Sequence, residues 1–407
     1  MPSSTSNSDH VRRSHPARRP HFPSASHAPH AATDEFEFAR VVPAVPWKAV
    51  LTTVVALTVA VAIGWEFYAR SQGYRPSLND TPDLWAQTRE KVQPNSLVLV
   101  GTSRMLFDAD LDVLEKAFGQ RPVQLALAGS SPYPVLEDLA KDTSFHGTVI
   151  VDIVPAMFLA PAGPPMEVSQ KALARRRDWN LAQRWSHQLG MLLEEHVAFL
   201  KQEDLTLGQL LKRVPIPDRA DAAIGPALPP YFFTVDRDRR GRMFEEAAIV
   251  GSPLQQRVAT GWLPLFTMPP PPKFIPPEQF GAMMGQMIEQ RFQDTQQHVA
   301  ALRARGARVV FVRLPVDPIL SEKEEKIVPL AAGWGRLVAE NGVPAINFAE
   351  HAELSAFKLP EWSHLSAPDS VEFTRRLVPH LRDAIERENQ RVARLAAAAT
   401  GAPTGSP

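Results

Sequence analysis

The chain of 407 residues contains no cysteine. It can therefore form no disulfide framework, no cysteine-ligated zinc site and no cysteine nucleophile. It also has no net charge, because 44 Lys and Arg residues balance 44 Asp and Glu residues. Without a basic excess or a familiar nucleic-acid module, the sequence predicts no nucleic-acid binding. Phosphate loops and dinucleotide fingerprints are absent too, and the 12 histidines are scattered, so we expect no cofactor and no metal.

Both ends of the chain, residues 1–46 and 397–407, have the composition of disordered tails. An apolar segment follows the first tail, with no charged residue between Lys48 and Glu66. With its flanks it covers residues 47–69, which is long enough to cross a bilayer. Aromatic side chains near both of its ends suit the membrane interfaces. We therefore expect an uncleaved transmembrane anchor over residues 47–69.

Two other interpretations of the apolar segment are weaker. A helix in the core of a soluble domain would carry a polar face, which this segment lacks. A cleaved signal peptide would have a short leader, whereas the whole 1–46 tail precedes this segment. Basic residues on its two sides differ little in number close to the membrane. We expect a single span in the inner (plasma) membrane, with the larger domain on the periplasmic or extracytoplasmic side.

After a predicted linker at 70–94, short apolar runs alternate with helical patterns. Runs of this length without polar alternation are typical of parallel strands that are buried on both faces. Strands that alternate with helices predict an α/β fold, here a three-layer sandwich around a five-stranded parallel sheet. The five runs are 96–100, 123–128, 148–154, 308–314 and 343–348.

One long segment, 155–276, does not follow this alternation. It contains a helical pattern over 168–185, a predicted hairpin with its turn at 236–241, and proline-rich loops. A stretch of this length between the third and fourth strands predicts an α-rich insertion, either a lid or a subdomain. The α/β domain that carries it is expected to cover residues 95–396.

The first predicted strand ends in Gly101-Thr102-Ser103, at the edge of the sheet where open α/β folds bind ligands. Serine is a weak nucleophile at neutral pH and needs a base. The candidate base is His364, which lies with Glu361 directly before the last predicted helix. The structural alternatives are a serine that caps the next turn, a surface or helix-capping histidine and a solvated glutamate.

These two motifs resemble those of the SGNH (GDSL-type) hydrolases. In that family a Gly-Asp/Thr-Ser motif after the first strand supplies the nucleophile, and a C-terminal Asp-x-x-His supplies the base and its orienting acid. The resemblance implies that Ser103 is the nucleophile, His364 the base and Glu361 the acid, where the family usually has Asp. It covers about 96–150 and 300–385 and leaves the insertion unexplained.

The resemblance also implies an oxyanion hole, which requires preorganised N–H donors. The amides of Ser103 and Gly129 are the expected donors. The family's third donor, an Asn after the third strand, is missing, because Asp152-Ile-Val-Pro stands at that place. Ser130 or Ser131 is the expected substitute, unless the activity is weak or absent.

Polar side chains near the strand ends are candidates for substrate binding, namely Arg104, Ser130 and Arg313. Arg313 and Asp317 follow the fourth strand closely in the sequence. For these two residues a structural Arg–Asp pair is the alternative.

Together these features predict acyl transfer through an acyl-serine. Water as the acceptor makes an esterase, and a sugar hydroxyl makes an O-acyltransferase. Membrane-tethered relatives in the family include O-acetylation proteins of exopolysaccharides and the cell wall, so the resemblance implies an acylated cell-envelope glycan as substrate. The alternatives are a non-catalytic SGNH-like module that binds glycan or scaffolds an envelope complex, and an assembly protein whose insertion binds a protein partner.

Overall fold

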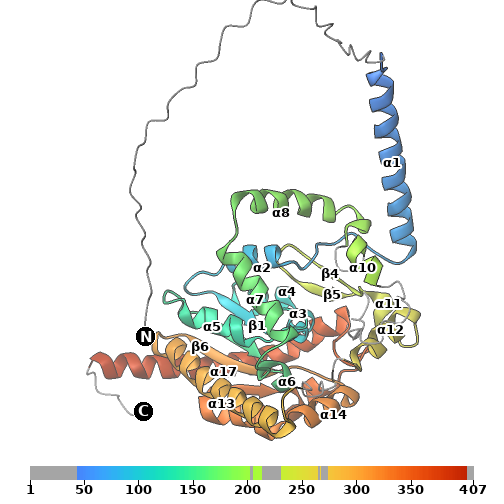
Figure 1. Ribbon diagram of the computed structural model, residues 1–407. Helices are drawn as coiled ribbons and strands as arrows, with labels where there is room; N and C mark the ends of the chain where they lie inside the picture. Colours follow the sequence, from blue (N-terminus) through green and yellow to red (C-terminus); the bar gives the residue numbers. More distant parts are fainter. Residues whose placement is uncertain (1–43, 202–204, 213–230, 265, 267–273, 401–407) are drawn as a thin grey trace, which may run out of the picture. The chain divides into compact units, whose positions relative to one another are not determined.

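The computed structural model describes residues 44–201, 205–212, 231–264, 266 and 274–400 (Figure 1). Contacts divide the chain into one unit that ends at Leu57 and a second that begins at Thr58. The sheet and the candidate site belong entirely to the second unit. Most of the predicted N-terminal tail, the last seven residues of the C-terminal tail and most of the proline-rich run after Met268 lie outside the described residues.

Helix α1 (Trp47–Ser71) has the length and composition of a single membrane span. Its most apolar 18-residue window has a mean hydropathy of 1.9, and none of that window is buried inside the protein. A helix of 25 residues is long enough for the hydrocarbon core of a bilayer. Within the described part of the chain it is the one helix that is both long enough and apolar enough to cross a membrane.

A five-stranded parallel sheet forms the centre of the second unit, as the sequence predicted. The strand order is β2-β1-β3-β6-β7, so the chain reverses its direction of winding between β1 and β3. Ligands of doubly wound sheets bind at such a point, beyond the carboxyl ends of the strands. The strands are β1 (Leu97–Val100), β2 (Val123–Gln124), β3 (Thr148–Asp152), β6 (Arg308–Arg313) and β7 (Ala345–Asn347).

Strand β2 is shorter than the apolar run that predicted it. Only two residues form a regular ladder, but the Leu125 amide still donates to the Leu99 carbonyl at 2.8 Å. The Leu127 amide likewise donates to the Gly101 carbonyl at 3.1 Å. The segment after β2 therefore follows β1 to its carboxyl end, so the next turn lies at the same edge of the sheet as Ser103.

Helices cover both faces of the sheet. Successive strand residues point to opposite faces, so Leu97 and Leu99 join one apolar cluster while Val98 and Val100 join another. The first cluster contains side chains of α3 (Ser103–Asp108), α4 (Leu111–Phe118) and α17 (Ala367–Thr400). The second contains side chains of α2 (Pro82–Arg89), α5 (Tyr133–Lys141), α13 (Pro277–Ala304) and α15 (Arg336–Asn341).

The predicted linker at 70–94 contains α2, which packs into the domain. Trp85 is fully buried, and its indole N–H donates to the Leu125 carbonyl at 2.9 Å. The buried Arg89 guanidinium pairs with Asp138 and Asp142. This segment therefore contributes to the core as well as joining α1 to it.

The described part of the insertion is mostly helical and carries the predicted hairpin, in which Val235 pairs with Gly241. Helix α7 ends at Arg177, well before the expected Trp185, because Asn180 forms a capping box with Gln183 and starts a new helix there. The elements are α6 (Pro155–Phe158), α7 (Pro164–Arg177), α8 (Leu181–Glu194), η1 (Ala198–Leu200), α10 (Leu207–Lys212), β4 (Phe233–Val235), β5 (Gly241–Met243), α11 (Glu245–Ala248) and α12 (Pro253–Trp262).

The helical pattern from Ser321 to Asn341 predicts one helix, but the structure has three shorter elements there. Pro329 lies in the break, and proline cannot donate the backbone hydrogen bond that a continuous helix needs. The last helix, α17, runs to Thr400 and so includes the first four residues of the tail that was predicted to be disordered from 397. The remaining elements are α14 (Pro318–Ile327), η2 (Ala331–Gly335), η3 (Phe348–Glu350) and α16 (Ala352–Ser355).

Candidate active site

Ser103 is the first residue of α3, directly after the turn that ends β1. Thr102 caps this helix, and its hydroxyl donates to Asp152 Oδ2 at 2.8 Å. Gly101 is required in the turn, because a Cβ there would lie 2.5 Å from Met105 Cβ and 2.8 Å from Asp152 Cβ. Contacts between β1, α3 and the end of β3 therefore set the position of the Ser103 hydroxyl.

His364 and Glu361 lie beside this serine. The Nε2 atom of His364 is 2.8 Å from Ser103 Oγ, although 261 residues separate the two in the chain. The Nδ1 atom of His364 is 2.9 Å from Glu361 Oε1, which also accepts the backbone N–H of His364 at 2.6 Å. The histidine and the glutamate are fully buried, while Ser103 is partly exposed. The three side chains form one continuous hydrogen-bonded chain.

The geometry assigns the protons of this chain. A carboxylate accepts hydrogen bonds and does not donate them, so Glu361 places the imidazole proton of His364 on Nδ1. The other ring nitrogen, Nε2, then has a free lone pair that faces the Ser103 hydroxyl. This is the tautomer that a general base for serine requires.

Trp262, at the end of α12 in the insertion, also contacts the site. Its indole N–H donates to Glu361 Oε2, and its ring packs edge-on against His364 with centroids 5.5 Å apart. Phe107 and Phe232 pack against the same imidazole. The sequence did not single out Trp262, because nothing local marks a contact between residues 99 positions apart.

The loop that carries Glu361 and His364 is held from several sides. Trp362 has a φ of 75°, a left-handed conformation that is uncommon for residues other than glycine, and its carbonyl accepts from the Asp317 amide. The Gln255 side chain donates to the Pro360 carbonyl at 2.7 Å. Strained backbone of this kind is found preferentially at functional sites.

Several buried charged side chains lie next to Ser103 and the loop that carries His364. Arg104 pairs with Glu324, and both side chains are almost fully buried. Burial opposes the charge on Arg104, but Glu324 outweighs it and raises the pKa of the guanidinium. Burial raises the pKa of Asp152, and raises that of Asp108 well above its ordinary value. Asp108 Oδ1 accepts the Leu365 amide at 2.8 Å and so anchors the end of the His364 loop.

The residues proposed for substrate binding make contacts within the protein. Arg104 is held by Glu324, and the Arg313 guanidinium donates to Asn347 Oδ1 at 3.3 Å. Burial lowers the pKa of Arg313. The alternative Arg313–Asp317 pair does not form among the described contacts, since the Asp317 carboxylate caps α14. A substrate role for these arginines stays a prediction.

The turn after β2 carries the second predicted oxyanion donor. Gly129 is exposed and has a φ of 64°, which suits glycine. The Ser130 hydroxyl donates to the Leu127 carbonyl at 2.9 Å, and that of Ser131 donates to the Phe158 carbonyl at 3.4 Å. Both hydroxyls are therefore directed at backbone carbonyls.

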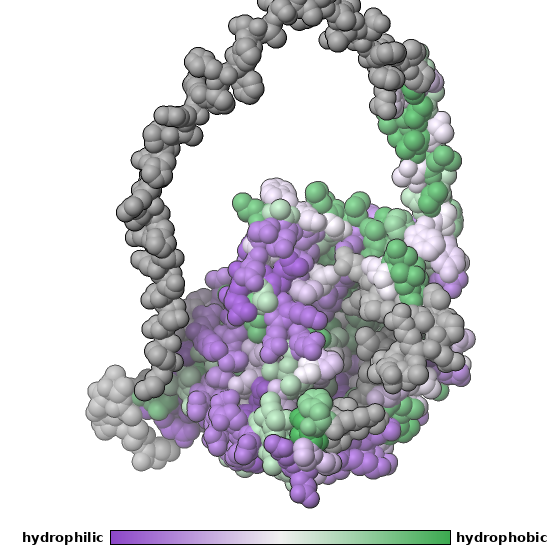
Figure 2. Space-filling view, in the orientation of Figure 1, coloured by the Kyte–Doolittle hydropathy of each residue, from purple (hydrophilic) through white to green (hydrophobic). Residues whose placement is uncertain are grey.

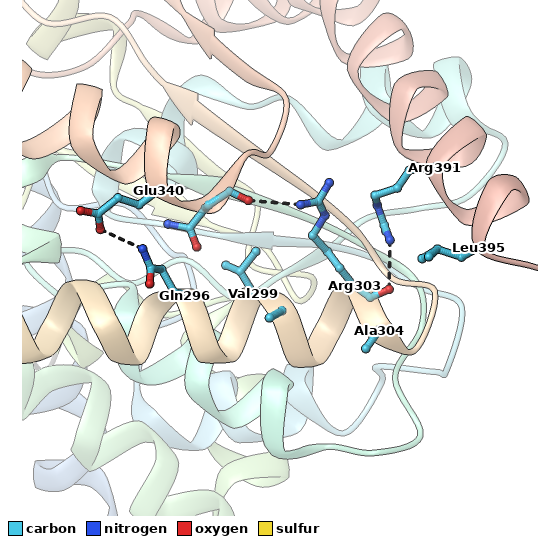
Figure 3. A pocket seen from close by; sticks show the side chains of 9 residues that line it. Gln296, Val299, Arg303, Ala304, Glu340, Arg391 and Leu395 are labelled. Carbon is cyan, nitrogen blue, oxygen red and sulfur yellow. Dashed lines mark hydrogen bonds between the residues drawn. The ribbon is translucent and has the colours of Figure 1, made fainter. Parts of the chain in front are cut away.

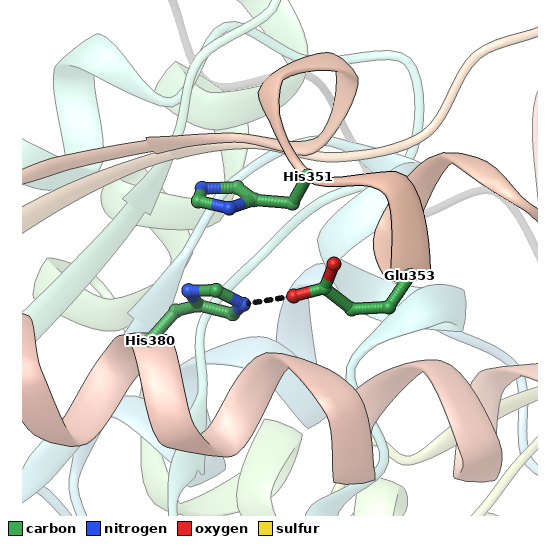
Figure 4. Close-up of side chains that lie close together, drawn as sticks. All are labelled: His351, Glu353 and His380. Atoms are coloured by element: carbon green, nitrogen blue, oxygen red, sulfur yellow. Dashed lines mark hydrogen bonds and ion pairs between the residues drawn. The ribbon is translucent and has the colours of Figure 1, made fainter.

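His351, Glu353 and His380 form a separate group of possible metal ligands (Figure 4). Their ligand atoms lie within 4.8 Å of one another, and two imidazoles with a carboxylate are a donor set that suits zinc. The sequence predicted no metal site, because α16 and α17 bring these residues together only in the fold. A hydrogen bond of 2.8 Å joins His380 to Glu353, so the closeness of these two side chains needs no metal to explain it.

A cavity of about 350 Å³ lies between α13, α15 and α17 (Figure 3). Two of its lining residues, Arg303 and Arg391, pair with the buried Glu388. Asn341, another lining residue, precedes β7, so the cavity lies toward the amino ends of the strands. Ser103 lies at the opposite, carboxyl edge, and the cavity is separate from the candidate active site.

No family model matches the chain, and neither does any curated protein or solved structure. The function of this chain must therefore be inferred from the geometry of its own residues.

Proposed function

We propose that the chain is a membrane-anchored serine esterase or O-acyltransferase of the SGNH type. In this proposal it acts on an acylated cell-envelope glycan through an acyl-serine intermediate. The observation that supports it most is the hydrogen-bonded chain from Ser103 through His364 to Glu361, with distances of 2.8 and 2.9 Å. Unrelated folds use the same arrangement of serine, histidine and carboxylate for nucleophilic catalysis.

In the proposed first step, His364 Nε2 takes the proton of the Ser103 hydroxyl as Oγ attacks the ester carbonyl carbon. Glu361 holds the imidazole in place and stabilises the positive charge that forms on it. The ester C–O bond breaks, and His364 returns the proton to the leaving oxygen. In the second step water or a sugar hydroxyl gives its proton to Nε2 and attacks the acyl-serine. The acyl group leaves on the acceptor oxygen, and Ser103 recovers its proton.

Backbone amides are the proposed donors to the oxyanion that forms in each step. Ser103 lies in the first turn of α3, where amides have no partner within the helix. Gly129 lies in the neighbouring turn, which the contact between Leu127 and Gly101 brings to the same edge of the sheet. Donors placed in this way stabilise negative charge where it develops.

Two features support an envelope polymer as the substrate. Helix α1 would hold the second unit at a membrane surface, where envelope glycans are assembled and modified. The insertion contributes Trp262 to the immediate surroundings of His364, so a segment outside the region of resemblance can shape the substrate site. The choice of a glycan over a soluble ester otherwise follows from the resemblance.

A serine-directed fluorophosphonate probe and p-nitrophenyl acetate hydrolysis test the proposal on the full-length protein in detergent. We expect labelling and hydrolysis in the native chain and neither in Ser103→Ala or His364→Gln. Ser355→Ala, at an exposed serine on α16, is the matched control and should behave like the native chain. Equal hydrolysis by the native chain and Ser103→Ala would remove the catalytic claim.

One observation favours a non-catalytic, glycan-binding or scaffolding module instead. Where the resemblance places the block with an oxyanion-binding Asn, the chain has Asp152-Ile-Val-Pro, and one carboxylate oxygen of Asp152 is bound by Thr102. No side-chain amide stands at that position. Retained glycan binding without fluorophosphonate labelling would support this second function.

A further inference from the structure

Helix α8 exposes an apolar stripe. Its five large apolar residues, separated by four, four, three and one positions, lie on one side of the helix. Each keeps between 53% and 76% of its surface exposed, although a stripe of this kind normally faces a core. Figure 2 shows hydrophobic atoms along the edge that α8 forms in Figure 1. The residues of this apolar stripe are Leu181, Trp185, Leu189, Leu192 and Leu193.

The other side of α8 is attached to the domain. Met191 is buried, and the Arg184 guanidinium pairs with Glu90. The Glu194 carboxylate accepts the Asn79 amide at 2.9 Å. These contacts fix the rotation of α8 about its own axis, so the apolar stripe faces away from the domain.

The residues that follow α8 are bonded to the last turns of α1. The Glu66 carboxylate accepts the amides of Ala198 and Phe199 at 2.9 and 3.1 Å. The Arg70 guanidinium donates to the His196 carbonyl at 3.3 Å. The apolar stripe therefore ends, at Leu193, only three residues before His196, which is bonded to the last turns of the candidate membrane span.

A second small apolar surface lies close to the same point. Leu205 packs in a cluster with Ala69 of α1, and α10 follows directly in the sequence. Leu207 and Leu211 of α10, four residues apart, are 72% and 57% exposed. Two helices near the end of α1 thus expose leucines.

We propose that α8 lies in the headgroup region of the membrane that α1 spans, with its apolar stripe directed at the acyl chains. Amphipathic helices of this kind bind lipid in proportion to the apolar area that they bury. A tryptophan within the stripe suits the interface, where its ring and its N–H meet different surroundings. The one arginine of α8, Arg184, is paired with Glu90, so the proposed contact depends on the apolar stripe and not on anionic lipid at this arginine. The proposal rests on α1 as a membrane span and is independent of the acyl chemistry.

The absence of native cysteine permits a direct test with single labels. Leu189→Cys, carrying an environment-sensitive fluorophore, is prepared in the full-length chain and reconstituted into phosphatidylcholine vesicles. Some of the lipid carries a nitroxide near the top of the acyl chain and quenches nearby fluorophores. We expect roughly a twofold or greater loss of fluorescence at position 189, since an interfacial helix sinks about 5–10 Å into this region.

Two further labels serve as controls. Val55→Cys, in α1, reports insertion of the span itself and should be quenched. Ile319 lies on α14, away from α8 in Figure 1, and is 44% exposed. Ile319→Cys is therefore a label at an exposed apolar position that the proposal does not place in the membrane. Its fluorescence should stay nearly unchanged. Adding Leu192→Glu to the Leu189→Cys chain should remove the quenching without changing the unfolding midpoint, because Leu192 is exposed.

The outcomes separate lipid from other occupants. Quenching at 55 and 189 but not at 319 supports the proposal. Quenching at 55 alone overturns it, as does equal quenching at 189 and 319. A label at 189 that becomes shielded in detergent as the chain self-associates overturns it in favour of a second copy. The esterase assay is separate, so its failure leaves this result unaffected.

Discussion

Replacing Glu361 by Gln and Trp262 by Phe, singly and together, tests the hydrogen bonds that orient the base. Glu361 accepts three N–H groups: two from His364 at Oε1 and one from Trp262 at Oε2. Glutamine offers one oxygen and one NH₂ group. Whichever way it turns, NH₂ must face an N–H donor.

The structure predicts which way the amide turns. His364 presents two donors and Trp262 only one, so the amide oxygen should face His364 and NH₂ should face the indole. Glu361→Gln then leaves a buried donor unsatisfied and should cost about 1–3 kcal/mol of stability. Trp262→Phe alone leaves Oε2 of a fully buried carboxylate without its partner, at a similar cost of about 1–3 kcal/mol.

In the double variant the clash disappears, because NH₂ faces a phenyl ring in place of an N–H. The double variant should therefore lose about 1–3 kcal/mol less unfolding free energy than the two single variants lose in sum. Hydrolysis by Glu361→Gln should fall about 10–100-fold, as expected for the loss of about 1.5–3 kcal/mol of charge-assisted hydrogen bonding to the imidazolium.

The assay is denaturant unfolding of the four full-length chains in detergent, with p-nitrophenyl acetate hydrolysis in parallel. Single losses that add to within about 0.5 kcal/mol would refute the shared hydrogen bonds. Complete loss of hydrolysis in Glu361→Gln without loss of stability would also refute the reasoning, since it would mean that NH₂ faces His364 and imposes the wrong tautomer.

Three other predictions follow from the supporting residues. Burial raises the pKa of Asp108 well above its ordinary value, so the folded state favours the protonated carboxyl. The stability that Asp108 contributes is therefore complete below the ordinary pKa and is lost as pH rises toward the raised one. Asp108→Asn should raise the unfolding midpoint more at pH 7 than near pH 4, and equal gains at both pH values would contradict this. Glu324→Gln leaves Arg104 buried without its charged partner and should cost about 3–5 kcal/mol in denaturant unfolding, with a loss below about 1 kcal/mol as the contrary result. Gly101→Ala should cost about 1–3 kcal/mol through overpacking and lower the rate of hydrolysis, whereas Gly285→Ala in α13, which has open space around it, should be neutral or stabilising in the same two assays.

The sequence predicted the elements that depend on local patterns. Five apolar runs without polar alternation indicated buried parallel strands, and each of them contains a strand of the sheet. Proline and capping residues changed several helix boundaries, as at Pro329 and Asn180, because a short local signal interrupts a longer apolar period. Ser103, His364 and Glu361 could be selected because each lies beside a predicted strand end or helix start.

The sequence could not predict contacts between distant segments. Trp262 meets Glu361 across 99 residues, and Arg104 meets Glu324 across 220, without a shared motif that marks either pair. The apolar stripe of α8 has the same spacing as a helix that faces a core, and only its surroundings reveal that it faces outward.

By itself, then, the order of residues determined the alternation of strands and helices, the apolar segment that is long enough to span a membrane, and the candidate nucleophile and base. Periodicity and local steric rules act over a few residues, so a single sequence displays them directly. The tertiary structure alone decided the strand order, the contacts of the carboxylate and the outward side of α8. These depend on which distant surfaces are buried against one another, which is a property of the whole folded chain.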